Sequence, residues 1–138
     1  MIGLDTNVLV RHIVQDNPAE GRAASALIAS RCSADDPGVV SLVVLCELVW
    51  VLDCGYGYDR GAIAAVLRQV LSVEDLLVDR SELAWQALHL YQNGKADFAD
   101  YLIGLSHRDQ GAAVTCTFDR RASSCDLFEL IGKGGKGD

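Results

Sequence analysis

The 138-residue chain lacks the features that would place it in a membrane or a secretory route. No apolar run approaches the roughly 20 residues needed to span a bilayer. The start, Met1-Ile2-Gly3-Leu4-Asp5, has no basic segment before an apolar stretch, so no signal peptide is expected. The five cysteines are odd in number and form no CxxC pair, which argues against a disulfide framework and a zinc site. We expect a cytoplasmic protein that makes no membrane contact.

An excess of basic residues is also missing. The formal net charge of −7 at first argues against a nucleic-acid partner. That objection weakens if several acids gather at one metal site, because setting five candidates aside leaves 14 acids against 12 Lys and Arg. The five are Asp5, Glu47, Asp97, Asp100 and Asp119. Net charge therefore excludes no class of ligand.

Two common catalytic signatures are absent. Without a GxxxxGK[ST] loop, nucleotide hydrolysis by a P-loop is unsupported. The sequence also has no GxSxG or Cys–His signature, and His12, His89 and His107 fall in segments expected to be helical, so a nucleophilic triad is disfavoured. Half of the residues are apolar and 22% are charged, which is typical of a folded protein, and the length fits one domain.

Short apolar runs alternate with segments of helical periodicity along the chain. This alternation predicts an α/β fold, a three-layer α/β/α sandwich around a mostly parallel sheet. We expect one domain over residues 1–131 and a Gly/Lys-rich C-terminal tail over residues 132–138, to which we assign no function. Strands are predicted at residues 1–4, 39–40, 76–78, 112–117 and 127–131. Helices are predicted at 8–14, 17–30, 41–53, 59–71, 81–90 and 97–106, with Asn17, Ser41 and Asp59 as N-caps.

The run from Leu42 to Leu52 contains ten apolar residues and one carboxylate, Glu47, in its middle. An ionised Glu buried alone is very unfavourable, so Glu47 must be protonated, paired with a cation, or turned to the surface. We expect it to point inward from its helix. The simpler alternative is a Glu at the surface or paired with an Arg.

Other carboxylates are placed to meet Glu47. Asp5 and Asp119 each follow a predicted strand, and the carboxyl ends of parallel strands meet at one edge of a sheet. Asp97 and Asp100 lie three residues apart in the first turn of a helix, on one face. Singly, Asp5 and Asp97 could each cap a helix, and Asp119 could begin a turn. Together the acids offer only oxygen ligands, which favour Mg²⁺ or Mn²⁺ and phosphodiester hydrolysis.

Four motifs in this order resemble the PIN-domain ribonucleases, and the context of Glu47 from Ser41 to Leu52 is similar to that of the VapC toxins of bacterial toxin–antitoxin pairs. The resemblance covers residues 2–130. Its motifs are Asp5-Thr6-Asn7, Glu47 within its apolar helix, Ala96-Asp97-Phe98-Ala99-Asp100-Tyr101-Leu102-Ile103, and Thr115-Cys116-Thr117-Phe118-Asp119-Arg120. A phosphatase of the haloacid-dehalogenase type would need a second Asp where Asn7 stands.

The resemblance implies a sheet of about five parallel strands. It also implies an Mg²⁺- or Mn²⁺-dependent endoribonuclease that hydrolyses structured RNA, such as tRNA or rRNA, through metal-activated water. The implied partners are the RNA substrate, a cognate antitoxin protein and a second copy of the chain in a homodimer. Two alternatives stay open: a housekeeping RNA-processing nuclease of the PIN type, and a non-catalytic partner-binding module of the same fold.

The resemblance also assigns roles to individual residues. It implies Asp5, Glu47, Asp100 and Asp119 as metal ligands, although either Asp97 or Asp100 could be the third; Asp97 is then a catalytic auxiliary. Thr6 or Asn7 is expected to hold the first acid in place, and Thr117 the last. Basic residues near the acids in sequence are candidates for gripping RNA: Arg11, Arg22, Lys95, Arg120 and Arg121.

Overall fold

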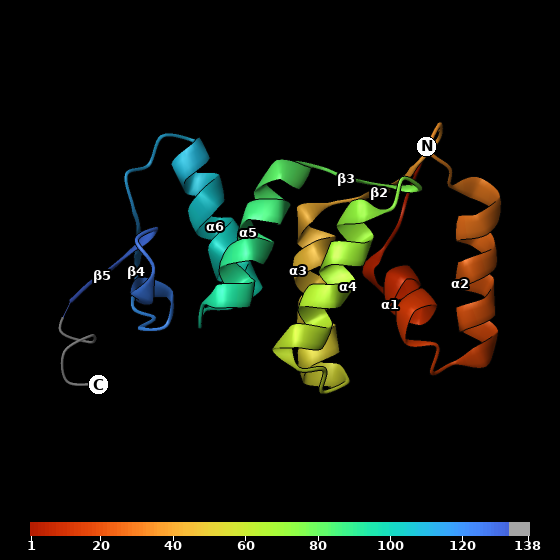
Figure 1. Cartoon of the computed structure of the whole chain (residues 1–138), viewed down its shortest axis with the longest axis horizontal. Coiled ribbons are helices and arrows are strands. Elements are labelled where there is room, and N and C mark those ends of the chain that lie inside the picture. The colour runs from red at the N-terminus through yellow and green to blue at the C-terminus, as the bar shows by residue number, and fades with distance from the viewer. Residues whose placement is uncertain (133–138) are drawn as a thin grey trace. The chain divides into compact units, whose positions relative to one another are not determined.

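The computed structural model describes residues 1–132 of the chain (Figure 1). The chain divides into two compact units, one formed by Met1–Ser81 and one beginning at Glu82. The predicted tail lies outside the described residues except for Gly132. No helix within residues 1–132 is long and apolar enough to cross a membrane.

The first unit is built on a three-stranded parallel sheet in the order β1-β2-β3. Ile2 pairs with Gly38, and Val40 pairs with Val78. Two helices connect β1 to β2, and two more, with a π-helical turn between them, connect β2 to β3. The elements are β1 (Ile2–Gly3), α1 (Thr6–Val14), α2 (Pro18–Arg31), β2 (Gly38–Val40), α3 (Leu42–Trp50), the π-helical turn η1 (Val51–Gly55), α4 (Arg60–Ser72) and β3 (Leu76–Val78).

The predicted N-caps of three helices in this unit are confirmed. The side-chain oxygen of Asn17 accepts a hydrogen bond from the Glu20 amide at 3.1 Å. In the same way Ser41 accepts from the Val44 amide, and Asp59 from the Ala62 amide. Each cap satisfies one of the amides that a helix leaves without a partner in its first turn, and so fixes where the helix begins.

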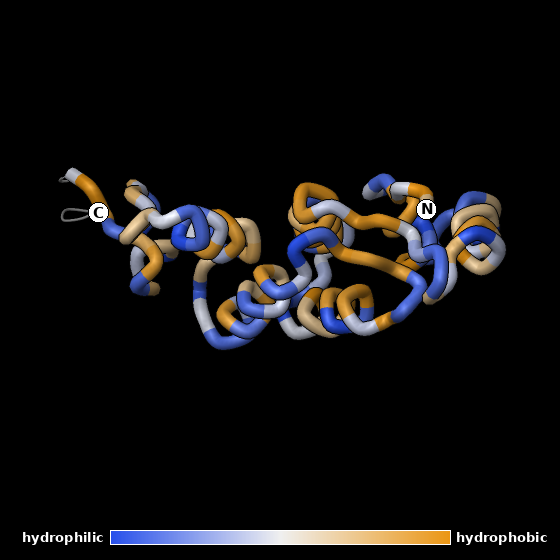
Figure 2. Tube along the Cα trace, turned by 90° about the horizontal axis from the view of Figure 1, so that it is seen from above, coloured by the Kyte–Doolittle hydropathy of each residue, from blue (hydrophilic) through white to orange (hydrophobic). Residues whose placement is uncertain are grey.

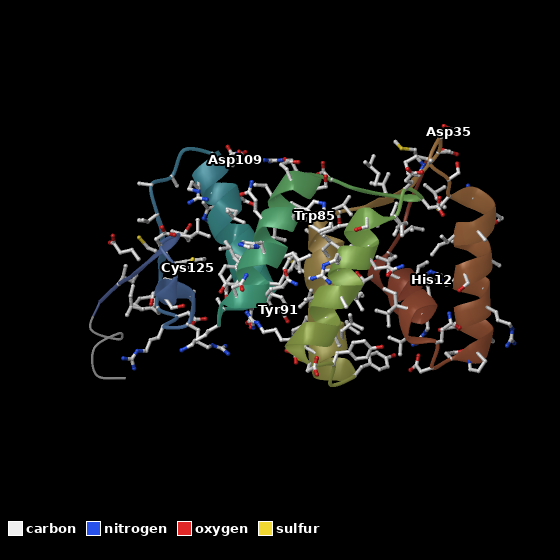
Figure 3. The ribbon with its side chains drawn as sticks, in the orientation of Figure 1. His12, Asp35, Trp85, Tyr91, Asp109 and Cys125 are labelled. Carbon is white, nitrogen blue, oxygen red and sulfur yellow. The ribbon has the colours of Figure 1, made fainter. Side chains whose placement is uncertain are left out.

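Apolar side chains from the strands and helices form the core of the first unit. Apolar residues predominate in the strands and in α3, whereas α1, α2 and α4 mix polar and apolar residues (Figure 2). Helix α1 packs against both α2 and α3. His12 of α1 lies at the α1–α2 contact, with its Nδ1 2.7 Å from Ser25 Oγ (Figure 3). The fully buried side chains of this core are Leu9, Val40, Leu45, Leu48, Leu52, Ile63 and Leu67.

The second unit contains two helices and a two-stranded parallel sheet. Tyr91 of α5 and Phe98 of α6 are both buried and meet edge to face, with ring centroids 6.0 Å apart. Helix α6 packs against β4. The elements are α5 (Ser81–Asn93), α6 (Phe98–Asp109), β4 (Thr115–Thr117), the 3-10 helix η2 (Ala122–Ser124) and β5 (Phe128–Leu130).

The predicted α/β class is confirmed, and every strand pairing among the described residues is parallel. All five predicted strands are present, although most are shorter than expected. The pairings divide them into three strands in the first unit and two in the second. That the chain forms a single domain stays a prediction.

Candidate active site

The first cluster of candidate residues lies where β1 passes into α1. Asp5 is the N-cap of α1, and its Oδ1 accepts the Thr6 amide at 2.7 Å. Thr6 is only 8% exposed, and its Oγ1 donates to Glu47 Oε1 at 2.5 Å. One residue therefore joins the two acids, through its amide to Asp5 and through its hydroxyl to Glu47. Of the alternatives Thr6 and Asn7, Thr6 makes these contacts.

The expectation that Glu47 points inward is wrong, because its side chain is exposed. Leu45, Leu48 and Val49 form the buried face of α3. Residues three or four apart share a helix face, so Glu47 shares its own face with Val43 and Trp50. Those two side chains are 69% and 67% exposed. Helix α3 thus has more apolar residues than its buried face can hold, and the exposed ones, Val43 and Trp50, flank Glu47.

A pocket of about 360 Å³ opens beside this cluster. Acidic, basic and aromatic side chains share its wall. Asp5 and Thr6 come from the start of α1, Glu47 and Trp50 from α3, and Tyr56 from the turn after η1. We call this cavity the acid pocket; Arg11 of α1 also lines it.

Arg11 is held at the acid pocket by three partners. Its Nε donates to Glu20 Oε1 at 2.6 Å, and its Nη1 donates to the Tyr56 hydroxyl at 3.2 Å and to Asp16 Oδ1 at 3.4 Å. The Tyr56 hydroxyl in turn donates to Asp16 Oδ2 at 2.9 Å. The hydrogen bonds to Glu20 and Tyr56 raise the pKa of Arg11, which stays charged. Sequence reasoning missed Asp16, Glu20 and Tyr56, because they lie 5, 9 and 45 residues from Arg11 and belong to no motif.

The second cluster lies in the second unit, at the start of α6. Asp97 is the N-cap of α6, and its amide donates to Asp100 Oδ2 at 3.2 Å. This is the returning half of a capping box, in which the third helical residue binds back to the N-cap. Asp97 is exposed and Asp100 is half-buried. The capping role considered for Asp97 is therefore present.

Asp119 is fixed by the turn that follows β4. Its amide donates to Thr117 Oγ1 at 3.0 Å, and its Oδ1 accepts the Arg121 amide at 2.8 Å and the Ala122 amide at 3.4 Å. Asp119 thus also begins a turn, the simpler role considered for it, and that turn leads into η2. The Thr117 hydroxyl holds the backbone of Asp119 in place.

The electrostatics of the second cluster raise the pKa of Asp100. Partial burial is the main cause, and repulsion from the Asp97 and Asp119 carboxylates adds to it. The hydrogen bond from the Asp97 amide and the positive charge of Arg121 oppose the rise. The carboxylates of this unit are therefore close enough to repel one another, a situation that a bound cation relieves.

The donor chemistry of both clusters fits a hard divalent cation. Asp5 Oδ2 and Glu47 Oε2 accept no hydrogen bond from residues 1–132, so each acid keeps an oxygen for a metal. The acids are divided between the units, with Asp5 and Glu47 in the first and Asp97, Asp100 and Asp119 in the second. Among the described residues, no three His, Cys, Asp or Glu side chains are arranged as a ready metal site.

The basic residues expected to bind RNA differ in their burial and in their pairing. Arg11 is half-buried and paired within the first unit. Arg120 and Arg121 are exposed and follow Asp119 directly, while Arg22 and Lys95 are exposed on α2 and in the α5–α6 turn. Phe118, which is 70% exposed, precedes Asp119.

Comparison with known proteins identifies the family. Curated protein sequences give no match to this chain. The PIN domain profile matches residues 2–126, which is nearly the whole chain and includes all five candidate acids. PIN domains are generally nucleases that use divalent metals, and the match extends through the last candidate acid, Asp119, to two residues beyond η2. The chain belongs to the PIN domain family.

Proposed function

We propose that this PIN domain is an endoribonuclease, the toxin of a type II toxin–antitoxin pair, which hydrolyses phosphodiester bonds in structured RNA. The observation that carries the proposal is the Thr6 bridge between Asp5 and Glu47. It couples two acids 42 residues apart in sequence, beside a pocket large enough for a ligand. A residue that holds one carboxylate through its amide and another through its hydroxyl is typical of the support around a metal site.

The proposal takes Asp5, Glu47, Asp100 and Asp119 as the metal ligands, as the family resemblance implies, and Mg²⁺ or Mn²⁺ as the ion. A divalent cation there would make water a stronger nucleophile and stabilise the leaving oxygen. Thr6 orients Glu47, and the turn after β4 orients Asp119. Asp97 caps α6 and holds Asp100 through its amide, which supports its role as an auxiliary.

The toxin assignment rests on the sequence context of Glu47. The run from Ser41 to Leu52 resembles the VapC pattern, and exposed apolar side chains flank Glu47 at Val43 and Trp50. A toxin of this kind needs a cognate antitoxin, and we propose that partner together with a homodimer. A gene for a small DNA-binding protein beside the coding sequence is the expected genomic sign. Its absence would favour an RNA-processing role.

The proposed activity is tested with purified protein freed of any antitoxin. RNA should be cleaved internally in Mg²⁺ or Mn²⁺ and left intact in EDTA, and Asp5→Asn should abolish cleavage because it removes one ligand charge. Asp126→Asn is the matched control, since Asp126 is an exposed acid outside both clusters. Equal cleavage by the Asp5→Asn variant would refute the metal site. Sequencing the RNA fragments formed after induced expression would identify the substrate.

A further inference from the structure

The acid pocket is lined by acids and also by basic and aromatic residues, which a metal site alone does not require. Asp5 and Glu47 line it together with Arg11, Trp50 and Tyr56. Its volume of about 360 Å³ is near the lower end of small-molecule sites, so it suits one nucleotide better than a longer segment.

Arg11 is prepared to meet an anion at this pocket. Its bonds to Glu20, Asp16 and Tyr56 use Nε and Nη1, and Nη2 makes no hydrogen bond within residues 1–132. A guanidinium carries five N–H donors in a rigid fork, and phosphate oxygens are well suited to its free edge. Because its partners already fix the side chain, little conformational entropy is lost when an anion binds.

Two aromatic side chains complete the wall. Tyr56 is oriented by its hydrogen bonds to Arg11 and Asp16. Trp50 is 67% exposed although it lines the pocket, and it lies one turn of α3 beyond Glu47. An exposed indole beside a fixed guanidinium is the pairing with which proteins bind single-stranded nucleic acid, because bases stack on the ring while phosphates bind the cation.

We propose that the acid pocket is a single-nucleotide subsite for the RNA substrate. A base of the RNA stacks on Trp50, a phosphate oxygen accepts from Arg11 Nη2, and the chain continues toward Asp5 and Glu47. The inference rests on the proposed function for the identity of the ligand as RNA. Asp5 and Glu47 repel a polyanion until a divalent cation neutralises them, so binding in this pocket requires the metal as well.

Fluorescence of Trp50 tests the proposal directly, because the chain has only two tryptophans. In full-length protein carrying Asp119→Asn, to prevent cleavage, and Trp85→Phe, Trp50 is the sole indole. A short single-stranded oligoribonucleotide in Mg²⁺ should quench its emission on binding. Trp50→Leu should weaken binding by roughly tenfold or more, while Trp50→Phe keeps most of the affinity. Val43→Ala is the matched control, since Val43 is equally exposed on α3 but does not line the pocket.

An abasic oligonucleotide separates the two contacts. Without bases, the loss caused by Trp50→Leu should vanish, whereas the loss caused by Arg11→Gln should remain. RNA that binds without quenching Trp50, or with unchanged affinity in Trp50→Leu, would overturn the subsite even where the wild-type protein cleaves RNA. Quenching by a basic peptide and not by RNA would overturn it in favour of a protein ligand. Quenching by RNA, when the wild-type protein cleaves no RNA, would uphold the subsite and refute the proposed function.

Discussion

At the scale of single residues, Thr6 shows how one buried residue holds two acids, Asp5 through its amide and Glu47 through its hydroxyl. Its backbone position is set by the Asp5 N-cap, and its side chain is 8% exposed. A buried hydroxyl needs a hydrogen-bond partner, and Glu47 supplies it at 2.5 Å. Glu47 is exposed, so without this bond its flexible side chain would sample several rotamers. Thr6 therefore reduces the entropy that Glu47 loses when a cation binds.

Thr6→Val tests this role, because Val has nearly the shape of Thr but no hydroxyl. We expect Mg²⁺ affinity or RNA cleavage to fall by roughly 10- to 100-fold, as for other residues that support metal ligands. Thr6→Ser keeps the hydroxyl and should retain most activity. Metal affinity is measured by calorimetry and cleavage by gel assay. If Thr6→Val and Thr6→Ser behave alike, the hydroxyl has no part in the site.

Asp100 makes the free energy of unfolding depend on pH. Its pKa is raised above the ordinary value of 3.8, mainly by burial and then by Asp97 and Asp119, so the folded state holds the proton more tightly than the unfolded chain. Without metal, the free energy of unfolding should therefore fall as pH rises from about 3.8 through the raised pKa. Asp100→Asn should remove this slope while keeping an oxygen for the Asp97 amide.

Denaturant unfolding in EDTA, from about pH 3 to pH 7, measures the slope. Above the raised pKa, the Asp100→Asn variant should be more stable than the wild type, since it lacks the charge that burial and the neighbouring acids disfavour. Asp126→Asn, at an exposed position of the same unit, serves as the control. An Asp100→Asn protein with the wild-type pH dependence would contradict the assigned cause.

At the scale of elements, the turn between α5 and α6 positions Asp97, the first acid of the second cluster. A Cβ at Gly94 would overlap the Tyr101 hydroxyl and stand 2.9 Å from the Leu90 carbonyl oxygen. Tyr101 is 2% exposed, and its hydroxyl accepts the Ala96 amide at 3.2 Å. The glycine thus allows a buried tyrosine of α6 to hold the turn that leads to Asp97.

Gly94→Ala should lower the free energy of unfolding by about 1–3 kcal/mol, because the methyl group displaces Tyr101. Tyr101→Phe removes the hydroxyl that the methyl would meet, so the double variant should be less destabilised than the sum of the two single changes. Gly61→Ala is the control: at that helical position the nearest atom lies 3.6 Å away, and Ala favours a helix. Thermal unfolding of the four proteins measures the coupling, and strict additivity would contradict it.

At the scale of the whole molecule, acidic residues outnumber basic ones. The net charge is −7, and the five candidate acids belong to a total of 19. Without a cation, the carboxylates of each cluster add repulsion to the folded state. A bound divalent ion removes repulsion and adds its own binding free energy to stability.

The midpoint of thermal unfolding should therefore rise when Mg²⁺ is added. At a hundredfold excess over the dissociation constant, the stabilisation is about 2.7 kcal/mol, which corresponds to a shift of roughly 10 °C for a chain of this size. Glu47→Gln should fold but show little shift, and KCl of equal ionic strength should have little effect. An equal Mg²⁺ shift in the Glu47→Gln variant would make Glu47 structural and the site smaller than proposed.

The sequence alone determined the class of fold and the order of its motifs. Alternating apolar runs and helical segments predicted the strands and helices, because backbone periodicity is local. Asn17, Ser41 and Asp59 marked helix starts for the same reason, since a capping side chain bonds within three residues. The motifs around Asp5, Glu47, Asp97, Asp100 and Asp119 resemble those of the PIN family, and the profile match confirms that family.

Only the tertiary structure decided which way Glu47 faces and what surrounds it. The apolar run from Leu42 to Leu52 indicated burial. A helix with apolar residues on every face, however, does not reveal from its sequence which face packs into the core. Packing of Leu45 and Leu48 into the core turned Glu47 outward, beside Thr6. The Arg11–Tyr56 contact likewise joins residues 45 apart, through side chains that no local pattern connects. Contacts between distant segments depend on how elements pack, which is why the acid pocket was not visible in the sequence.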